Sequence, residues 1–162
     1  MTNGIRPATV DDVPELIAMV RELADYEHAV DEAVATPAQF TDALFGEQPA
    51  VYALIAETEG GDIAGFALYF LNFSTWLGKH GIYLEDLYVR PAFRGHGYGQ
   101  RLLGALAQTC LDRGYGRLEW WVLDWNQPSR DFYEAHGARA LTEWIPYRVT
   151  GPELTALAGL DA

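Results

Sequence analysis

A glycine-rich segment, Arg94-Gly95-His96-Gly97-Tyr98-Gly99, separates a strand-like stretch from a helix-like one. Residues 82–90 before it are rich in apolar and aromatic side chains, and Pro91 ends the pairing of such a strand because proline lacks an N–H. After the segment, leucines at helical spacing predict a helix over residues 98–113, which Gly114 is suited to end. This strand–turn–helix pattern favours an α/β protein whose helices cover a sheet.

The turn itself has the properties of an anion site. Glycines allow a tight turn that brings backbone N–H groups close to a bound group, and the helix N-terminus adds donors and partial positive charge. Arg94 and Arg101 offer full positive charges. Two common nucleotide motifs do not fit, because Gln100 and Arg101 replace the Lys-Ser/Thr pair of a P-loop, and Leu102 replaces the third glycine of a dinucleotide site. A plain strand-to-helix turn is the alternative.

Hydrophobic periodicity predicts the other elements, in the overall order β-α-α-β-β-β-α-β-α-β-β. Thr9 with Asp12 and Thr36 with Gln39 have the spacing of capping boxes at the start of two helices. Residues 76–81 are expected to form a loop. Strands are expected over 5–8, 51–58, 63–73, 82–90, 118–125, 138–143 and 144–149, and helices over 9–26, 36–45, 98–113 and 128–136. We expect a mixed α/β sheet with helices on its faces, in one domain over residues 1–162.

The formal net charge of −12 bears on the class of partner. So much negative charge repels a phosphate backbone, which argues against a nucleic-acid partner. It favours the approach of a cationic substrate, although solubility alone explains the charge equally well.

Other features argue against a membrane, a secreted protein and a metal site. No apolar run approaches the roughly 20 residues that span a bilayer. Residues 1–6 lack the basic and apolar regions of a signal peptide. Cys110 is the single cysteine, and the four histidines lack the spacing of metal ligands. We therefore expect a cytoplasmic protein that holds no metal.

Several short sequence motifs point to one family. Arg94, Gly97 and Gly99 meet the (Gln/Arg)-x-x-Gly-x-(Gly/Ala) signature of the GCN5-related acetyltransferases, the GNAT superfamily. Within it, the chain resembles the spermidine/spermine and thialysine acetyltransferase branch, the diamine acetyltransferases, over residues 5–148. The words that carry this resemblance are FSTW at 73–76, YLEDLYV at 83–89, LDWNQ at 123–127, and DFY at 131–133 before Gly137-Ala138.

The resemblance implies a GNAT fold, whose mostly antiparallel central sheet is splayed in the middle and has helices on both faces. It implies an N-acetyltransferase that takes acetyl-CoA as donor, and a homodimer. It also implies that the backbone N–H of Leu87 stabilises the oxyanion. The residues that it places against the coenzyme are Leu87, Val89, Arg94, Gly95, His96, Gly97, Tyr98, Gly99, Gln100, Asn126 and Tyr133. For Asn126, an Asx turn that opens the next helix is the alternative.

Direct acetyl transfer needs a base and an acid. An alkylammonium is not a nucleophile at neutral pH, so the amine must lose a proton, and the departing thiolate must gain one. The resemblance assigns Tyr133 as general acid, with packing in the core as the alternative. Glu85 is the candidate base, through water, and Asp86 a candidate anchor for a distant ammonium; the two roles are exchangeable. Because they are neighbours in a strand, their side chains point to opposite faces of the sheet unless the strand bulges. The alternative is that both are solvated carboxylates on the surface.

Four more residues are candidates for the substrate side. Tyr26 and Glu27 match the family's substrate wall, while Trp76 and Trp144 either line the amine pocket or pack in the core. Ser74 stands where polyamine-specific members carry an acidic residue, which favours thialysine, a short diamine or another lysine-like amine over spermidine. Two other functions stay open: acetylation of a protein or peptide amine, and a non-catalytic sensor that binds acyl-CoA.

Overall fold

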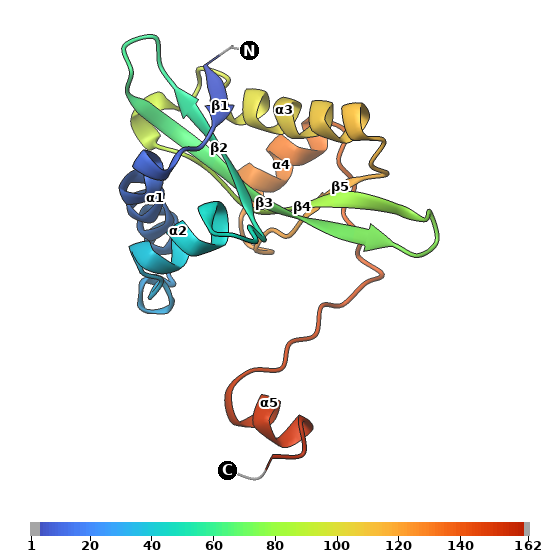
Figure 1. The fold of residues 1–162 in the computed structure, drawn as a ribbon. Coiled ribbons are helices and arrows are strands. Elements are labelled where there is room, and N and C mark those ends of the chain that lie inside the picture. The colour runs from blue at the N-terminus through green and yellow to red at the C-terminus, as the bar shows by residue number, and fades with distance from the viewer. Residues whose placement is uncertain (1–3, 161–162) are drawn as a thin grey trace. The chain divides into compact units, whose positions relative to one another are not determined.

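The computed structural model describes residues 4–160 and contains a five-stranded sheet in the order β1-β2-β3-β4-β5 (Figure 1). The first four strands pair antiparallel with their neighbours, and β5 runs parallel to β4. The strands are β1 (Ile5–Pro7), β2 (Tyr52–Glu57), β3 (Ile63–Ser74), β4 (Lys79–Val89) and β5 (Leu118–Trp120). The expected mixed, mostly antiparallel sheet is confirmed.

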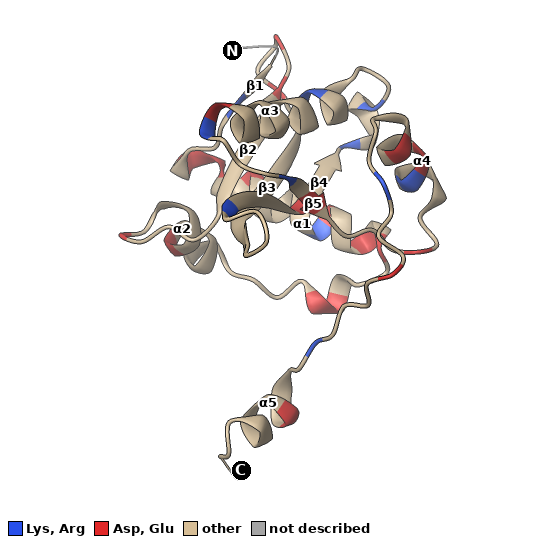
Figure 2. Ribbon diagram, turned by 90° about the vertical axis from the view of Figure 1, so that its right-hand side faces the viewer, with Lys and Arg blue, Asp and Glu red and all other residues tan. Residues whose placement is uncertain are grey.

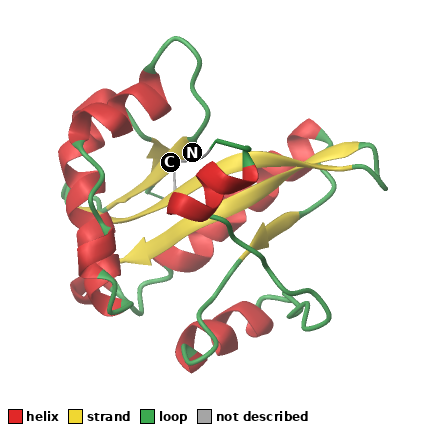
Figure 3. Ribbon diagram, turned by 90° about the horizontal axis from the view of Figure 1, so that it is seen from below, coloured by secondary structure: helices red, strands yellow, loops and turns green. Residues whose placement is uncertain are grey.

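The chain divides into two compact units, residues 1–121 and 122–162. The first carries the whole sheet with α1 (Val13–Tyr26), α2 (Pro37–Phe45) and α3 (Tyr98–Arg113). In this unit α1 and α2 cover one face of the sheet and α3 covers the other (Figures 1 and 3). The second unit carries α4 (Gln127–Ala135) and α5 (Gly151–Leu157).

The helix starts follow the local sequence signals. The backbone N–H of Thr9 donates to Asp12 Oδ2 at 2.7 Å, so the first capping box forms around a 3-10 turn, Val10–Asp12, just before α1. The second box forms at α2, where Thr36 Oγ1 accepts from the N–H of Gln39 and the N–H of Thr36 donates to Gln39 Oε1. Both capping predictions are confirmed.

The main core lies between the sheet and α1 and α2. Helix α1 supplies Leu16, which is fully buried, together with Met19. The buried members of this cluster are Leu16, Met19, Leu44, Ala53, Ile55, Phe66, Leu68 and Tyr88. On the other face, α3 buries Leu102, Leu103, Leu106 and Cys110. Cys110 packs there as a small apolar residue, and its burial raises the pKa of its thiol.

Three sequence-based expectations are wrong. Strand β4 begins at Lys79, so the expected loop over 76–81 is the tip of a β3–β4 hairpin and the start of a strand. Strand β5 ends at Trp120, five residues earlier than expected. Residues 138–143 and 144–149 form no strand in the described chain; instead α5 follows them. Within residues 4–160, no helix is long and apolar enough to cross a membrane.

Candidate active site

A β-bulge in β4 lies at the two candidate acidic residues. Leu68 of β3 pairs with Asp86 and Tyr69 pairs with Leu84, so Glu85 is the extra residue between them. Leu68 belongs to the core under α1 and α2, which places Asp86 on that side of the sheet. Phe70 is two residues from Leu68 and so lies on the same side, as does its partner Tyr83. Glu85 is two residues after Tyr83 and therefore also lies on this side. Because of the bulge, the two carboxylates lie on one side of the sheet and can serve one site.

The acidic groups on this side of the sheet influence one another. Burial, together with the negative charges of Glu85 and Glu27, raises the pKa of Asp86 to about 7. Glu27, at the C-terminal end of α1, is half-buried, and burial also raises its pKa. Glu85 is exposed. The structure thus brings together three predicted site residues, one of which titrates near neutral pH.

The glycine turn between β4 and α3 has the backbone expected of an anion cradle. Gly95 and Gly97 have φ values of +80° and +79°, in the left-handed region that favours glycine. A Cβ added at either would meet nothing within 4 Å, so the space beside both glycines is open. Gly97 is the N-cap residue of α3, whose first N–H groups have no acceptor inside the helix. These features fit the pyrophosphate of coenzyme A.

Arg94 links the glycine turn to the acidic residues described above, Glu27, Glu85 and Asp86. Its guanidinium carbon lies 5.9 Å from the centre of the Tyr26 ring and 5.8 Å from that of Tyr88, and its Nε donates to the carbonyl of Val89 at 2.8 Å. Tyr26 is the chain neighbour of Glu27. Predicted cofactor and substrate residues therefore adjoin each other within the first unit.

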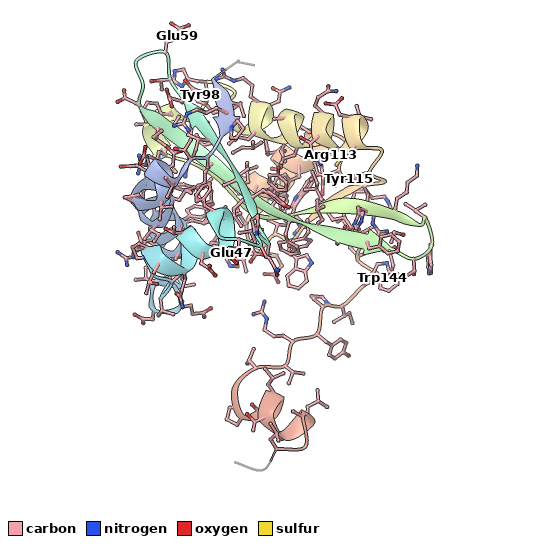
Figure 4. The ribbon with its side chains drawn as sticks, viewed as in Figure 1. Glu47, Glu59, Tyr98, Arg113, Tyr115 and Trp144 are labelled. Atoms are coloured by element: carbon pink, nitrogen blue, oxygen red, sulfur yellow. The ribbon has the colours of Figure 1, made fainter. Side chains whose placement is uncertain are left out.

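The rest of the turn is held by Arg101. Its guanidinium lies 4.2 Å from the ring centre of Tyr98 and donates to the carbonyl of His96 at 3.0 Å. Tyr98, at the first position of α3, is labelled in Figure 4. His96 and Gln100 are exposed, and His96 Nδ1 lies 3.0 Å from the carbonyl oxygen of Arg94. The turn is ordered by its own contacts, which leaves its outer surface accessible.

Strand β4 continues past the end of its pairing with β5. The parallel pairs run from Ile82 with Leu118 to Leu84 with Trp120, whereas β4 extends to Val89. Leu87 and Val89 are two residues apart, so their backbone N–H groups point to the same edge of the strand. Past the bulge, β4 therefore has no β5 partner at Leu87 and Val89, and we call this stretch the opening.

Two predicted residues belong to the second unit. Asn126 is buried and caps α4, because its Oδ1 accepts from the N–H of Ser129 at 3.3 Å. This contact matches the Asx-type alternative; contact with the coenzyme stays a prediction. Tyr133 is half-buried in α4, and its ring meets that of Phe132 edge-on at 5.6 Å.

The two tryptophans predicted to line the amine pocket are largely exposed. Trp76 is 89% exposed at the tip of the β3–β4 hairpin, and Trp144 is 65% exposed in the second unit (Figure 4). The core-packing alternative is thereby wrong for Trp76, while both alternatives for Trp144 stay predictions. Ser74 at the base of the tip is buried, and its Oγ accepts from the N–H of Leu77 at 3.1 Å. Ser74 therefore closes the hairpin.

Sequence reasoning missed a polar group on β3 and β5. Glu119 pairs across the parallel ladder with Tyr83. Its Oε2 accepts from Asn72 Nδ2 at 2.9 Å, and its Oε1 lies 3.4 Å from Arg117 Nε. The alternation of charged and apolar residues at 117–120 was the available signal, but only the strand pairing shows that Glu119 adjoins Tyr83.

Comparisons with known proteins agree with this architecture. The model of the acetyltransferase (GNAT) family matches residues 16–138. A thialysine N-epsilon-acetyltransferase from Bos taurus is 38% identical over 96% of each chain. An L-ornithine N5-acetyltransferase from Arabidopsis thaliana is 31% identical, covering 99% of this chain and 90% of its own. Among solved structures, an integron cassette protein from V. cholerae superimposes with a TM-score of 0.78 at 28% identity, over 95% of this chain and 96% of its own.

The fold thus agrees with that of a similar solved structure, and the sequence relatives match nearly the whole chain. The GNAT signature at Arg94, Gly97 and Gly99 lies inside the region that the family model matches. The protein belongs to the GNAT family and is an N-acetyltransferase.

Proposed function

We propose that the protein transfers the acetyl group of acetyl-CoA directly to the amino group of a small cationic amine of the thialysine, diamine or polyamine type. One observation carries the proposal: an anion-binding turn and an acidic group adjoin each other. Arg94 of the turn lies over Tyr26, and the next residue, Glu27, acts on the pKa of Asp86. One neighbourhood therefore suits both a phosphate-bearing donor and a cationic acceptor.

Acetyl-CoA supplies an activated acetyl thioester when bound. The glycine turn fits its pyrophosphate, since Gly95 and Gly97 leave open space beside backbone N–H groups at the start of α3. Arg94 adds a positive charge in a chain whose net charge is −12. The opening between β4 and β5 gives room for the thioester arm beside Leu87 and Val89.

The acidic pair prepares the amine. Glu85 accepts the proton that the ammonium must lose, through a water molecule, and Asp86 holds negative charge beside it. A carboxyl group with a pKa of about 7 is better matched to proton transfer near neutral pH than an ordinary carboxyl, so Asp86 is placed to share the role. The charge of the pair also attracts the cation before transfer.

Two further groups complete the transfer. The backbone N–H of Leu87, in the stretch of β4 beyond its pairing with β5, donates to the oxyanion that forms when the amine attacks. Tyr133 protonates the departing thiolate. Together with the base, these groups provide the donor, acid and proton acceptor that acyl transfer requires. A homodimer that works in the cytoplasm is part of the proposal.

The likeness to relatives named for thialysine and for L-ornithine supports an amino-acid-like or diamine acceptor. The end of the β3–β4 hairpin agrees with an acceptor of this size. Ser74, where an extra carboxylate would suit a longer polyamine, is buried and bonded to the backbone of Leu77. It therefore offers no charge to a distant ammonium.

The test is release of coenzyme A thiol from acetyl-CoA, followed with a thiol reagent. The panel holds thialysine, lysine, ornithine, short diamines, spermidine, spermine and a basic peptide. We expect turnover with a small amine and a loss of about 100-fold in kcat for Tyr133→Phe and for Glu85→Gln. Tyr147→Phe and Glu59→Gln, at exposed positions, are the matched controls.

Turnover of the peptide alone would replace the proposal with protein acetylation. Binding of acetyl-CoA without turnover of any amine would replace it with the sensor.

A further inference from the structure

The face of the sheet that carries Glu85 continues toward the hairpin as a strip of aromatic side chains. The ring of Tyr83 lies 5.0 Å from that of Phe70 and 5.9 Å from that of Trp121, which it meets edge-on. Trp121 is 60% exposed. Aromatic faces of this kind suit a methylene chain or a cation passing over them.

A charged pair lies at the end of this strip. Glu119 stands opposite Tyr83 in the parallel ladder, and Arg117 is two residues before it, so both are on the side of the sheet that Tyr83 occupies. Asn72 Nδ2 and Arg117 Nε fix the carboxylate, at 2.9 and 3.4 Å. The side chains of Arg117 and Glu119 are 42% and 30% exposed, so a ligand can reach both.

Each member of the pair keeps capacity for a ligand. A carboxylate has about four acceptor sites, and only two are taken in the contacts with Asn72 and Arg117. A guanidinium has five N–H donors in a planar fork that matches a carboxylate, and one nitrogen of Arg117 faces Glu119. An acceptor for an ammonium and a donor for a carboxylate therefore lie side by side.

The spacing suits one class of molecule. With strands about 4.8 Å apart and a rise of about 3.3 Å per residue, the Cα atoms of Glu85 and Glu119 are about 8 Å apart. An extended chain advances roughly 1.2 Å per bond, so the two nitrogens of a lysine-like amine, six bonds apart, are about 7 Å apart. A substrate whose reacting amine meets Glu85 can thus reach Glu119 with its other end.

We propose that Glu119 binds the α-ammonium and Arg117 the α-carboxylate of a lysine-like amino acid whose side-chain amine is acetylated at Glu85. The inference rests on the proposed function and adds to it the residues that select an amino-acid head group. Asn72 is a positioning residue, since it acts through Glu119. The Tyr83 and Trp121 rings flank the methylene chain between the two ends.

The experiment compares three acceptors of equal chain length with acetyl-CoA: lysine, 1,5-diaminopentane, which lacks the carboxylate, and pentylamine, which also lacks the second ammonium. We expect Arg117→Gln to lower kcat/KM for lysine at least tenfold, to lower it less for 1,5-diaminopentane because Arg117 also holds Glu119, and to leave pentylamine unchanged. Glu119→Gln is expected to lower kcat/KM for lysine and for 1,5-diaminopentane, with pentylamine unchanged. Arg113→Gln, on α3, and Glu59→Gln, in the β2–β3 turn, are matched controls (Figure 4).

The outcomes separate the inference from the function on which it rests. If the protein acetylates small amines but Arg117→Gln leaves the ratio of lysine to 1,5-diaminopentane unchanged, the inference is wrong and the proposed function stands. If the protein acetylates none of the panel amines, both fail. A uniform loss for all three acceptors, with a lowered melting temperature, would assign Arg117 and Glu119 a structural role instead. Arg117→Lys, which keeps the charge, is expected to recover part of the activity with lysine.

Discussion

Asp86 of β4 lies in register with Leu68 of β3, whereas its neighbour Glu85 has no partner of its own on that strand. The bulge places two successive carboxylates on the side of the sheet that α1 covers. There Glu27 adds a third negative charge and burial removes water, so the pKa of Asp86 rises to about 7. The charge of the site therefore varies with pH in the physiological range.

Asp86→Asn is expected to stabilise the protein at pH 8. The folded-state pKa of Asp86 is raised, so its ionisation at high pH costs stability that the neutral amide does not lose. A shift of about three units bounds the effect at about 4 kcal/mol, and because the group is half-buried we expect about 1–2 kcal/mol. Denaturant unfolding should show the full gain at pH 8, part of it at pH 5, and none at pH 3, below the ordinary carboxyl pKa of 3.8. Asp62→Asn, in an exposed turn, should change little at any of these pH values.

Activity should fall as the pH drops through about 7, because protonation of Asp86 removes negative charge beside the amine. In Asp86→Asn this step should vanish from a plot of kcat/KM against pH. The increase in kcat/KM near the pKa of the free amine, which reflects deprotonation of the substrate, should stay. A step near pH 7 that persisted in the variant would assign it to another group.

Gly97→Ala should weaken binding of acetyl-CoA. The residue has φ +79°, so an alanine there is strained by about 1 kcal/mol and displaces the N–H groups at the start of α3. We expect KM for acetyl-CoA to rise about tenfold with little change in KM for the amine. Gly61→Ala, with φ +88° and equally open space in the β2–β3 turn, carries the same strain away from the site. If both variants raised KM alike, the cradle would not be the cause.

Asp12→Asn should destabilise the protein by about 2–3 kcal/mol at pH 7. Asp12 is buried, its carboxylate pairs with Arg6 at 2.7 Å, and it accepts from the N–H of Thr9. These partners lower its pKa, so the contribution is present above about pH 4 and is lost as the pH falls through the folded-state value. Thermal unfolding of wild type and variant should converge toward pH 2, and Asp11→Asn, which is exposed, should resemble wild type throughout.

Gly81→Ala should disturb the pair at Arg117 and Glu119. An added Cβ would lie 2.6 Å from Asn72 Oδ1 and 2.9 Å from the carbonyl oxygen of Arg117, so backbone must move. We expect a loss of about 1–3 kcal/mol in stability. Gly104→Ala on α3, where the space is open, should be neutral or stabilising in the same unfolding assay.

The sequence predicted what depends on near neighbours in the chain. The Thr36–Gln39 capping box and the strand–turn–helix arrangement around the glycine turn follow from spacings of a few residues, and both are confirmed. Acidic residues also spread over many elements, as the negative net charge predicts (Figure 2).

What the sequence could not supply depends on pairing between distant segments. The bulge at Glu85 exists because Leu68 and Tyr69 pair with Asp86 and Leu84. Residues 138–149 have the composition of strands, but a strand also needs a partner edge, and in the described chain this stretch has none. The position of Glu119 beside Tyr83 likewise follows only from the register of a parallel ladder.

The short ladder between β4 and β5 has a consequence for how this protein could evolve or be engineered. Each extra residue of pairing beyond Trp120 would strengthen the sheet and narrow the opening beside Leu87. Substitutions selected only for heat resistance should therefore tend to close the stretch of β4 that we propose receives the thioester. Greater thermal stability is better sought at β1 and β2, far from that opening, because tighter packing there does not oppose turnover.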